Sequence, residues 1–170
     1  MKNQQRTHDT VKRLLLVCYG AMMLYLLFVR GRSIESELPY WQRIAINYNL
    51  VPFSTVWKYW DILARPEYYL EKFVAYAIYK AQAEAAIVNL VGNVVMFIPL
   101  GYFLPAIWQK LRKLGKTVLT GAVIIVLIEV AQLLSLRGYC DIDDLILNVL
   151  GIMAGYLFWR ITFTMRCKRK

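Results

Sequence analysis

The sequence predicts an all-α, polytopic membrane protein, with about four transmembrane helices and amphipathic interfacial helices in its first outer loop. Hydrophobic residues make up 59% of the 170 residues and the mean hydropathy is +0.42, which is too apolar for a soluble chain of this length. A helix needs roughly 20 mostly apolar residues to cross a bilayer. Four runs qualify, at approximately 14–29, 86–108, 117–136 and 145–163. We expect residues 1–170 to form a single domain.

The first run follows Lys12-Arg13, as the apolar part of a signal peptide would. No small-residue cleavage site comes after it, because Arg30-Gly31-Arg32 follows instead. We therefore expect an uncleaved anchor. The next segment, 31–85, is too apolar to be disordered and is expected to form the outer loop.

Two parts of this loop predict short helices. The turn sequence Leu50-Val51-Pro52-Phe53 leads to Ser54 and Thr55, either of which is a suitable helix N-cap. The aromatic residues at 57–60 suit the headgroup level of a bilayer. From Pro66, apolar residues recur at helical spacing as far as Ala81, which favours a helix that lies on the membrane surface.

The net charge of +10 is concentrated in three basic clusters: the N-terminal tail, the connection 110–116 and the C-terminus. With four spans, these clusters lie on one side, and the positive-inside rule puts them and both termini in the cytoplasm. This placement favours anionic lipid headgroups as partners and argues against nucleic acid. The three cysteines, Cys18, Cys140 and Cys167, then fall in different compartments, so no disulfide is expected.

Polar residues converge in the outer half of three spans. In the third span, Glu129 lies about 10 Å below the outer end at 1.5 Å per residue. Ionisable side chains inside a span cost free energy and mark candidate functional sites. We expect the following side chains to lie at similar depth: Asn89, Asn93, Glu129, Gln132, Asp144 and Asn148. The alternative is that these polar groups only join helices, as the packing pattern Gly151-x-x-x-Gly155 does.

The last outer connection, Arg137–Asp144, adds further chemistry. His8, the one histidine of the chain, lies in the N-terminal tail, and there is neither a Cys/His cluster for zinc nor a Walker-type glycine loop. No cofactor is evident. If a divalent cation binds, Asp141, Asp143 and Asp144 are the candidate ligands. Carboxylate acid–base catalysis would use Glu129, Asp141 or Asp144. Arg137 is suited to bind phosphate or carboxylate.

The chain resembles the VanZ-like family of bacterial membrane proteins from Asn47 onward. The resemblance is carried by Asn49-Leu-Val-Pro52-Phe53, Gly92-Asn93-x-x-x-Phe97-x-Pro99-x-Gly101, Glu129-x-x-Gln132, and Arg137 through Gly151. It implies a protein of the bacterial cytoplasmic membrane with a role in resistance to teicoplanin and related lipoglycopeptides. The motif positions that it singles out are Asn49, Pro52, Phe53, Asn93, Glu129, Gln132, Arg137, Asp141, Asp143, Asp144 and Asn148.

Three functions fit these observations. The first is a binding or envelope-modifying protein whose outer-leaflet polar pocket engages membrane lipid, a lipid-linked cell-wall precursor or the lipoglycopeptide itself. The second is an enzyme that acts on a lipid-linked substrate through Glu129 and the aspartates, with or without a divalent metal. The third is a scaffold for partner membrane proteins, in which the polar groups only hold helices together.

Overall fold

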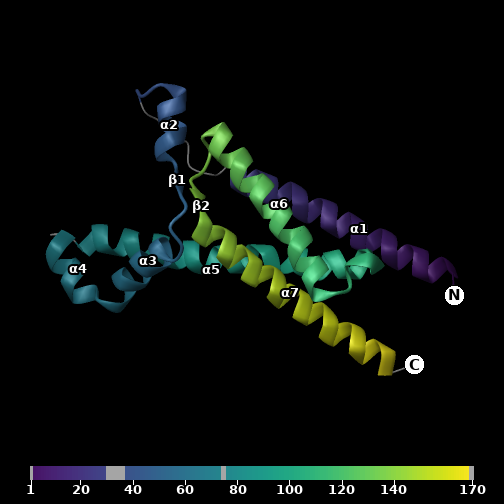
Figure 1. Ribbon diagram of the computed structural model, residues 1–170. Helices are drawn as coiled ribbons and strands as arrows, with labels where there is room; N and C mark the ends of the chain where they lie inside the picture. The colour runs from purple at the N-terminus through teal and green to yellow at the C-terminus, as the bar shows by residue number, and fades with distance from the viewer. Residues whose placement is uncertain (1, 30–36, 74–75, 169–170) are drawn as a thin grey trace.

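The fold is helical, as predicted, and the computed structural model describes residues 2–29, 37–73 and 76–168 (Figure 1). The helices in chain order are α1 (Lys2–Leu24, followed by a π-helical turn at Tyr25–Val29), α2 (Tyr40–Ile46), α3 (Ser54–Ala64), α4 (Pro66–Phe73), α5 (Tyr76–Ile107), a 3-10 turn (Gln109–Leu111), α6 (Leu114–Ser135) and α7 (Ile142–Lys168). Two short strands, β1 (Tyr48–Asn49) and β2 (Cys140–Asp141), complete the described elements.

Four of the described helical segments are long and apolar enough to cross a membrane: Asp9–Val29, Tyr76–Ile107, Leu114–Ser135 and Ile142–Met165. They contain the greater part of each of the four predicted spans. Since a bilayer leaves exposed backbone groups without water to bond, such runs adopt helices that satisfy their own hydrogen bonds. The chain is therefore a multi-pass membrane protein.

The second membrane helix is longer than the sequence predicted. Residues 76–81, which we expected in a surface helix, and residues 82–85, which we expected in the outer loop, belong to α5, which runs for 32 residues. The stretch from Ala81 to Ala86 contains only good helix formers, so no signal ends the helix there. At 1.5 Å per residue α5 is about 48 Å long, and α3 and α4 pack beside its N-terminal end (Figure 1).

The closest helix pair is α5 with α7, and glycines make the approach tight. A Cβ atom on Gly151 would overlap the carbonyl oxygen of Val94, and one on Gly155 would overlap that of Ile98. The predicted Gly151-x-x-x-Gly155 pattern is thus a packing interface. The buried hydrophobic core lies on the inner faces of the same bundle and comprises Met23, Phe97, Leu100, Leu104, Ile125 and Ile152.

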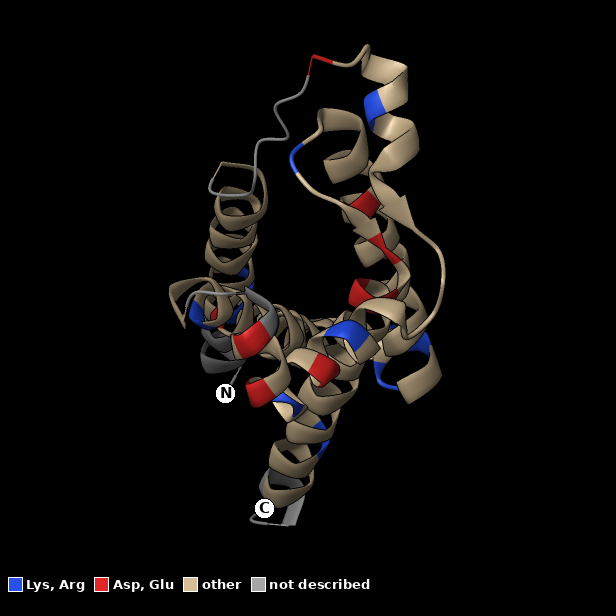
Figure 2. Cartoon of the chain, turned by 90° about the vertical axis from the view of Figure 1, so that its left-hand side faces the viewer, with Lys and Arg blue, Asp and Glu red and all other residues tan. Residues whose placement is uncertain are grey.

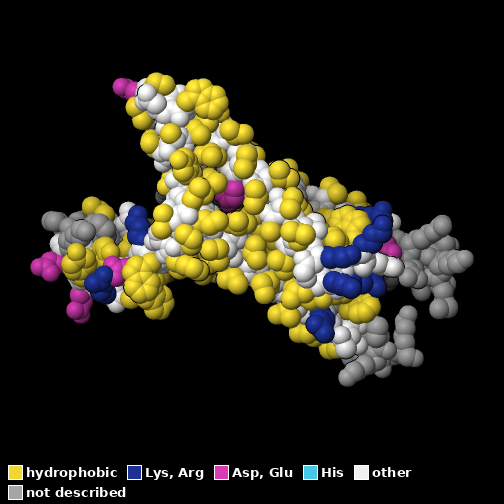
Figure 3. Space-filling view, in the orientation of Figure 1, with side chains coloured by type: hydrophobic (Ala, Val, Ile, Leu, Met, Phe, Trp, Pro, Cys, Tyr) yellow, Lys and Arg dark blue, Asp and Glu magenta, His cyan; other side chains and the backbone are white. Residues whose placement is uncertain are grey.

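The two ends of the molecule differ in charge. Lysine and arginine side chains gather at the end where both termini lie, as the sequence predicted for the basic clusters (Figure 3). The opposite end, which we call the outer end after the predicted topology, carries acidic residues at several places (Figure 2). Cys18 and Cys140 are free thiols. Residues 31–36 of the predicted outer loop, and the side chains of His8 and Cys167, lie outside the described part of the chain.

Candidate functional site

Two short strands that the sequence did not predict, β1 and β2, pair at the candidate site. β1 and β2 are parallel, with Tyr48 opposite Cys140 and Asn49 opposite Asp141. The Cys140 backbone N–H also donates to the carbonyl oxygen of Asn47 at 3.0 Å. Strands of two residues are too short to show an alternating hydrophobic pattern. The pairing places the turn that precedes α3 against the start of α7.

The carboxylate of Asp143, in the first turn of α7, accepts hydrogen bonds from backbone N–H groups at the start of α3. Its Oδ1 accepts a hydrogen bond from the Phe53 backbone N–H at 2.5 Å, and its Oδ2 accepts from the N–H groups of Thr55 at 2.8 Å and Val56 at 3.0 Å. Asp143 is fully buried. The start of a helix presents unpaired N–H groups and a positive dipole end, so this carboxylate caps α3.

This arrangement corrects the predicted cap of α3. The residue before the helix is Phe53, which has a left-handed backbone with φ 63°, and its side chain makes no cap hydrogen bond. The Ser54 hydroxyl donates to the Val51 carbonyl oxygen at 2.8 Å. The Thr55 hydroxyl donates to Asp141 Oδ2 at 2.5 Å. Because Asp143 already supplies the acceptor, both hydroxyls are free to bond elsewhere.

Asp141 is equally well bonded. Besides Thr55, it accepts hydrogen bonds from the Asp143 N–H at 2.9 Å and from Asn49 Nδ2 at 3.4 Å. Donors of the chain thus occupy both oxygens of Asp141 and of Asp143. In the part of the chain that the structure describes, no group of three or more Asp, Glu, His or Cys side chains could hold a metal ion. The predicted cation site on Asp141, Asp143 and Asp144 does not fit this arrangement.

Asp144 joins α7 to α5. Asn93 Nδ2 donates to Asp144 Oδ1 at 2.5 Å, and the Asn89 side chain bonds to the same carboxylate. One turn further along α7, the side chain of Asn148 is only 3% exposed. Asn89 Oδ1 and Asn148 Oδ1 are both buried and have no hydrogen-bond partner among the residues that the structure describes. The predicted meeting of α5 and α7 polar groups is confirmed for Asn93 and Asp144.

Glu129 faces the interior from α6. The residue is 8% exposed, and the backbone N–H of Asp141 interacts with its carboxylate. Its Oε2 atom is buried and has no hydrogen-bond partner among the described residues. Glu129 therefore lies with the α5–α7 polar groups and does not face lipid.

Two predicted site residues lie apart from these groups. Gln132 Nε2 donates to the Leu27 carbonyl oxygen at 3.3 Å, so Gln132 ties α6 to the end of the first membrane helix. Arg137 is exposed, and its N–H donates to the Gln132 carbonyl oxygen at 3.0 Å to close α6. The described ion pairs are Lys12–Asp9, Arg65–Asp61 and Lys80–Glu84. A pairing of Arg137 with Asp141 or Asp144 is therefore not seen in the described chain.

The structure adds residues that the sequence did not place in the site. Asn47 is buried, and its Nδ2 has no partner among the described residues. Asn89 was predicted to lie at the right depth, and its contact with Asp144 now places it in the site. No sequence signal would have placed Thr55 in the site, because its role there is a hydrogen bond to Asp141, which is distant in the sequence. We call the following residues the polar cluster: Asn47, Asn49, Asn89, Asn93, Glu129, Asp141, Asp143, Asp144 and Asn148.

Comparison with known proteins gives one finding. The chain matches the VanZ/LLP1 family model over residues 14–163, a range that contains every residue of the polar cluster. Comparisons with curated proteins and with solved structures gave no match. Because the family model covers most of the chain, this membrane protein belongs to the VanZ/LLP1 family.

Proposed function

We propose that this VanZ-like protein binds the polar head of an amphiphile in the outer leaflet, and that the bound species is a membrane lipid or a lipid-linked cell-wall precursor. Through this binding or a change in the envelope that follows from it, the protein would confer resistance to teicoplanin and related lipoglycopeptides. The observation that carries the proposal is a set of buried, unpartnered polar atoms in the polar cluster: Asn47 Nδ2, Asn89 Oδ1, Glu129 Oε2 and Asn148 Oδ1.

The energetics favour a binding role over one of joining helices. A buried polar atom without a partner costs about 1–3 kcal/mol, and four such atoms together cost several kcal/mol. Polar groups that serve only to join helices would be bonded to each other, as Asn93 and Asp144 are. A group supplied from outside the chain would satisfy the remaining atoms and recover that cost.

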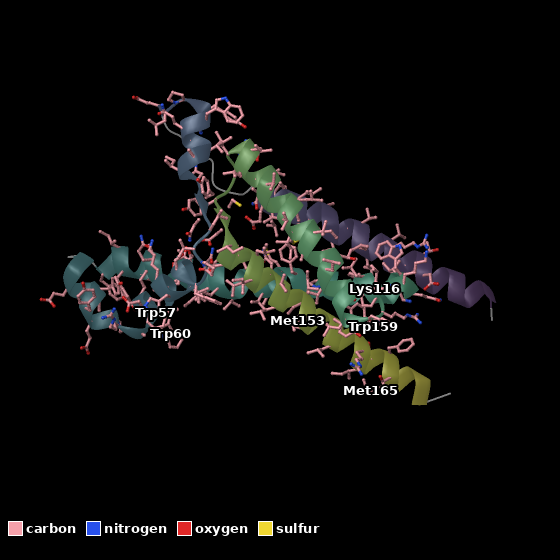
Figure 4. The ribbon with its side chains drawn as sticks, viewed as in Figure 1. Trp57, Trp60, Lys116, Met153, Trp159 and Met165 are labelled. Atoms are coloured by element: carbon pink, nitrogen blue, oxygen red, sulfur yellow. The ribbon has the colours of Figure 1, made fainter. Side chains whose placement is uncertain are left out.

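Exposed apolar side chains beside the cluster favour an amphiphile over a water-soluble ligand. We call Leu50, Val51 and Phe53 the apolar tip; their side chains are between 60% and 64% exposed. They are also close to the cluster, since Asn49 precedes the tip and the Phe53 N–H bonds to Asp143. Trp57 and Trp60 project from α3 and are exposed as well (Figure 4). An acyl or prenyl chain would lie against the tip while its head reached the cluster.

The backbone of Phe53 supports this assignment. A left-handed conformation costs a non-glycine residue roughly 1–2 kcal/mol. The exposed ring of Phe53 does little to offset that cost through burial within the chain. Strained residues of this kind occur at ligand-binding positions. Arg137, exposed on the adjacent connection, would bind a phosphate of the same ligand.

A second candidate function is catalysis on a lipid-linked substrate. It is favoured by one observation: Glu129 has a buried carboxylate oxygen that no described group bonds. Asp141, also a candidate acid or base, is occupied by protein donors. The enzyme hypothesis therefore rests on Glu129, with Asp144 beside it.

The test of the proposal is a teicoplanin-susceptibility assay on Glu129→Gln, with membrane abundance measured in the same cells. Glu84→Gln is the matched control, because Glu84 is an exposed carboxylate on α5 whose ion pair in the described chain is with Lys80. We expect Glu129→Gln to lose resistance at normal abundance and Glu84→Gln to keep it. Unchanged resistance in Glu129→Gln would refute the site. Loss of abundance together with resistance would favour the scaffold.

A further inference from the structure

The unpartnered atoms of the polar cluster also indicate which kind of head group would bind. Three of the four are acceptors, namely Asn89 Oδ1, Glu129 Oε2 and Asn148 Oδ1. The orientation of Asn89 follows from its chemistry, because its amino group must face the Asp144 carboxylate and its oxygen must therefore face away. Resting on the function proposed above, we propose that the ligand presents a primary ammonium group to Glu129 and its neighbours.

The charge of the cluster supports a cation. Glu129, Asp141, Asp143 and Asp144 bring four carboxyl groups to one place, and the ion pairs seen in the described chain, Lys12–Asp9, Arg65–Asp61 and Lys80–Glu84, involve none of them. Asp143 is compensated by three backbone N–H groups at a helix start. Asp141 and Asp144 are compensated by neutral donors. Glu129 has the fewest donors and is the carboxylate where a cation would gain most.

Counting donors separates a primary ammonium from other cations. A primary ammonium carries three N–H donors on a compact charge, which matches three unpartnered acceptors. A quaternary ammonium has the charge but no donor, and it would leave all three acceptors unsatisfied. A divalent metal is disfavoured because the cluster lacks a set of ligands that could hold one in the described chain. The ligand class is therefore an amphiphile with an amino head group.

The test is a methylation series of lipids with identical acyl chains, added to the purified full-length protein and followed by native mass spectrometry. The probes are phosphatidylethanolamine, its N,N-dimethyl form, phosphatidylcholine and phosphatidylglycerol. We expect retention to fall in that series, by at least tenfold between the ethanolamine and choline lipids. Glu129→Gln and Asn148→Leu should remove the preference, whereas Glu84→Gln should keep it.

Each outcome has a defined meaning. Equal retention of the ethanolamine and choline lipids by the wild-type protein would overturn the ammonium proposal, even if the variants do not fold. If Glu129→Gln still lowered the retention of all four lipids, the function proposed above would survive that result. If neither cluster variant altered the retention of any lipid, both proposals would fail. The last experiment adds free ethanolamine to the protein–lipid complex. Displacement of the lipid by equimolar ethanolamine would show that the acyl chains contribute nothing to binding, and would overturn the proposal that the ligand is an amphiphile.

Discussion

Replacing Asp143 with asparagine is expected to loosen the first turn of α3. The change keeps the side-chain size but removes the charge, and it puts an amino group where one of the two acceptor oxygens was. At least one of the N–H groups of Phe53, Thr55 and Val56 then faces a donor. A lost N-cap costs about 0.5–2 kcal/mol, a favourable partly buried charge at a helix start is worth up to about 2 kcal/mol, and an unsatisfied buried donor costs about 1–3 kcal/mol. Since these effects overlap, we expect α3 to lose about 2–4 kcal/mol of local stability.

Hydrogen exchange measures this loss directly. If exchange of the α3 amides is limited by local opening, the expected change is an acceleration on the order of 30- to 900-fold for peptides that cover residues 54–64. Peptides from the interior of α6 should exchange as in the wild-type protein. Glu84→Gln, which alters an exposed carboxylate, should leave α3 unchanged. An Asp143→Asn protein that folds and shows no acceleration in α3 would refute the assignment of Asp143 as the cap.

Three further predictions follow from single contacts. Gly151→Ala should lower membrane abundance sharply because its Cβ would overlap the Val94 carbonyl oxygen, whereas Gly92→Ala, with open space around the Cβ, should be tolerated. In a Cys140-only variant, a membrane-impermeant maleimide should label from outside. Burial, with the neighbouring carboxylates, raises the pKa of the Cys140 thiol, so labelling should be slower at pH 7.5 than for an exposed cysteine and should accelerate at higher pH; an equal rate would contradict this. Phe53→Gly should stabilise the turn by up to about 1–2 kcal/mol in thermal unfolding while weakening lipid retention; a destabilised turn would show that the ring packs within the chain.

The membrane helices were predictable because their signal is carried by many residues. Each span is a long apolar run, and a bilayer permits few alternatives to a helix for such a run. The meeting of Asn93 with Asp144 was predictable as well, because consecutive spans run in opposite directions and this fixes the relative depth of their polar residues. The same reasoning placed Glu129 inside the bundle, as the structure shows.

The contacts around α3 could not be predicted, for a different reason. Asp143 binds backbone N–H groups some 90 positions away, and every non-proline residue has such a group, so no side-chain pattern identifies the partner. The parallel pairing of Asn49 with Asp141 involves only two residues in each strand. Read from sequence, three closely spaced aspartates suggest a metal site. In the structure they have separate tasks, with Asp143 capping α3 and Asp144 bonding α5.

We propose that the buried atoms around Glu129 receive a ligand from outside the chain. Electron cryomicroscopy of the protein extracted in native-membrane nanodiscs tests it most directly, at a resolution that separates side chains. We predict non-protein density within hydrogen-bond distance of Glu129 Oε2 and Asn148 Oδ1, continuing toward the apolar tip at Leu50, Val51 and Phe53. A map in which these two atoms bond only to groups of the chain itself, or only to water, would contradict the claim.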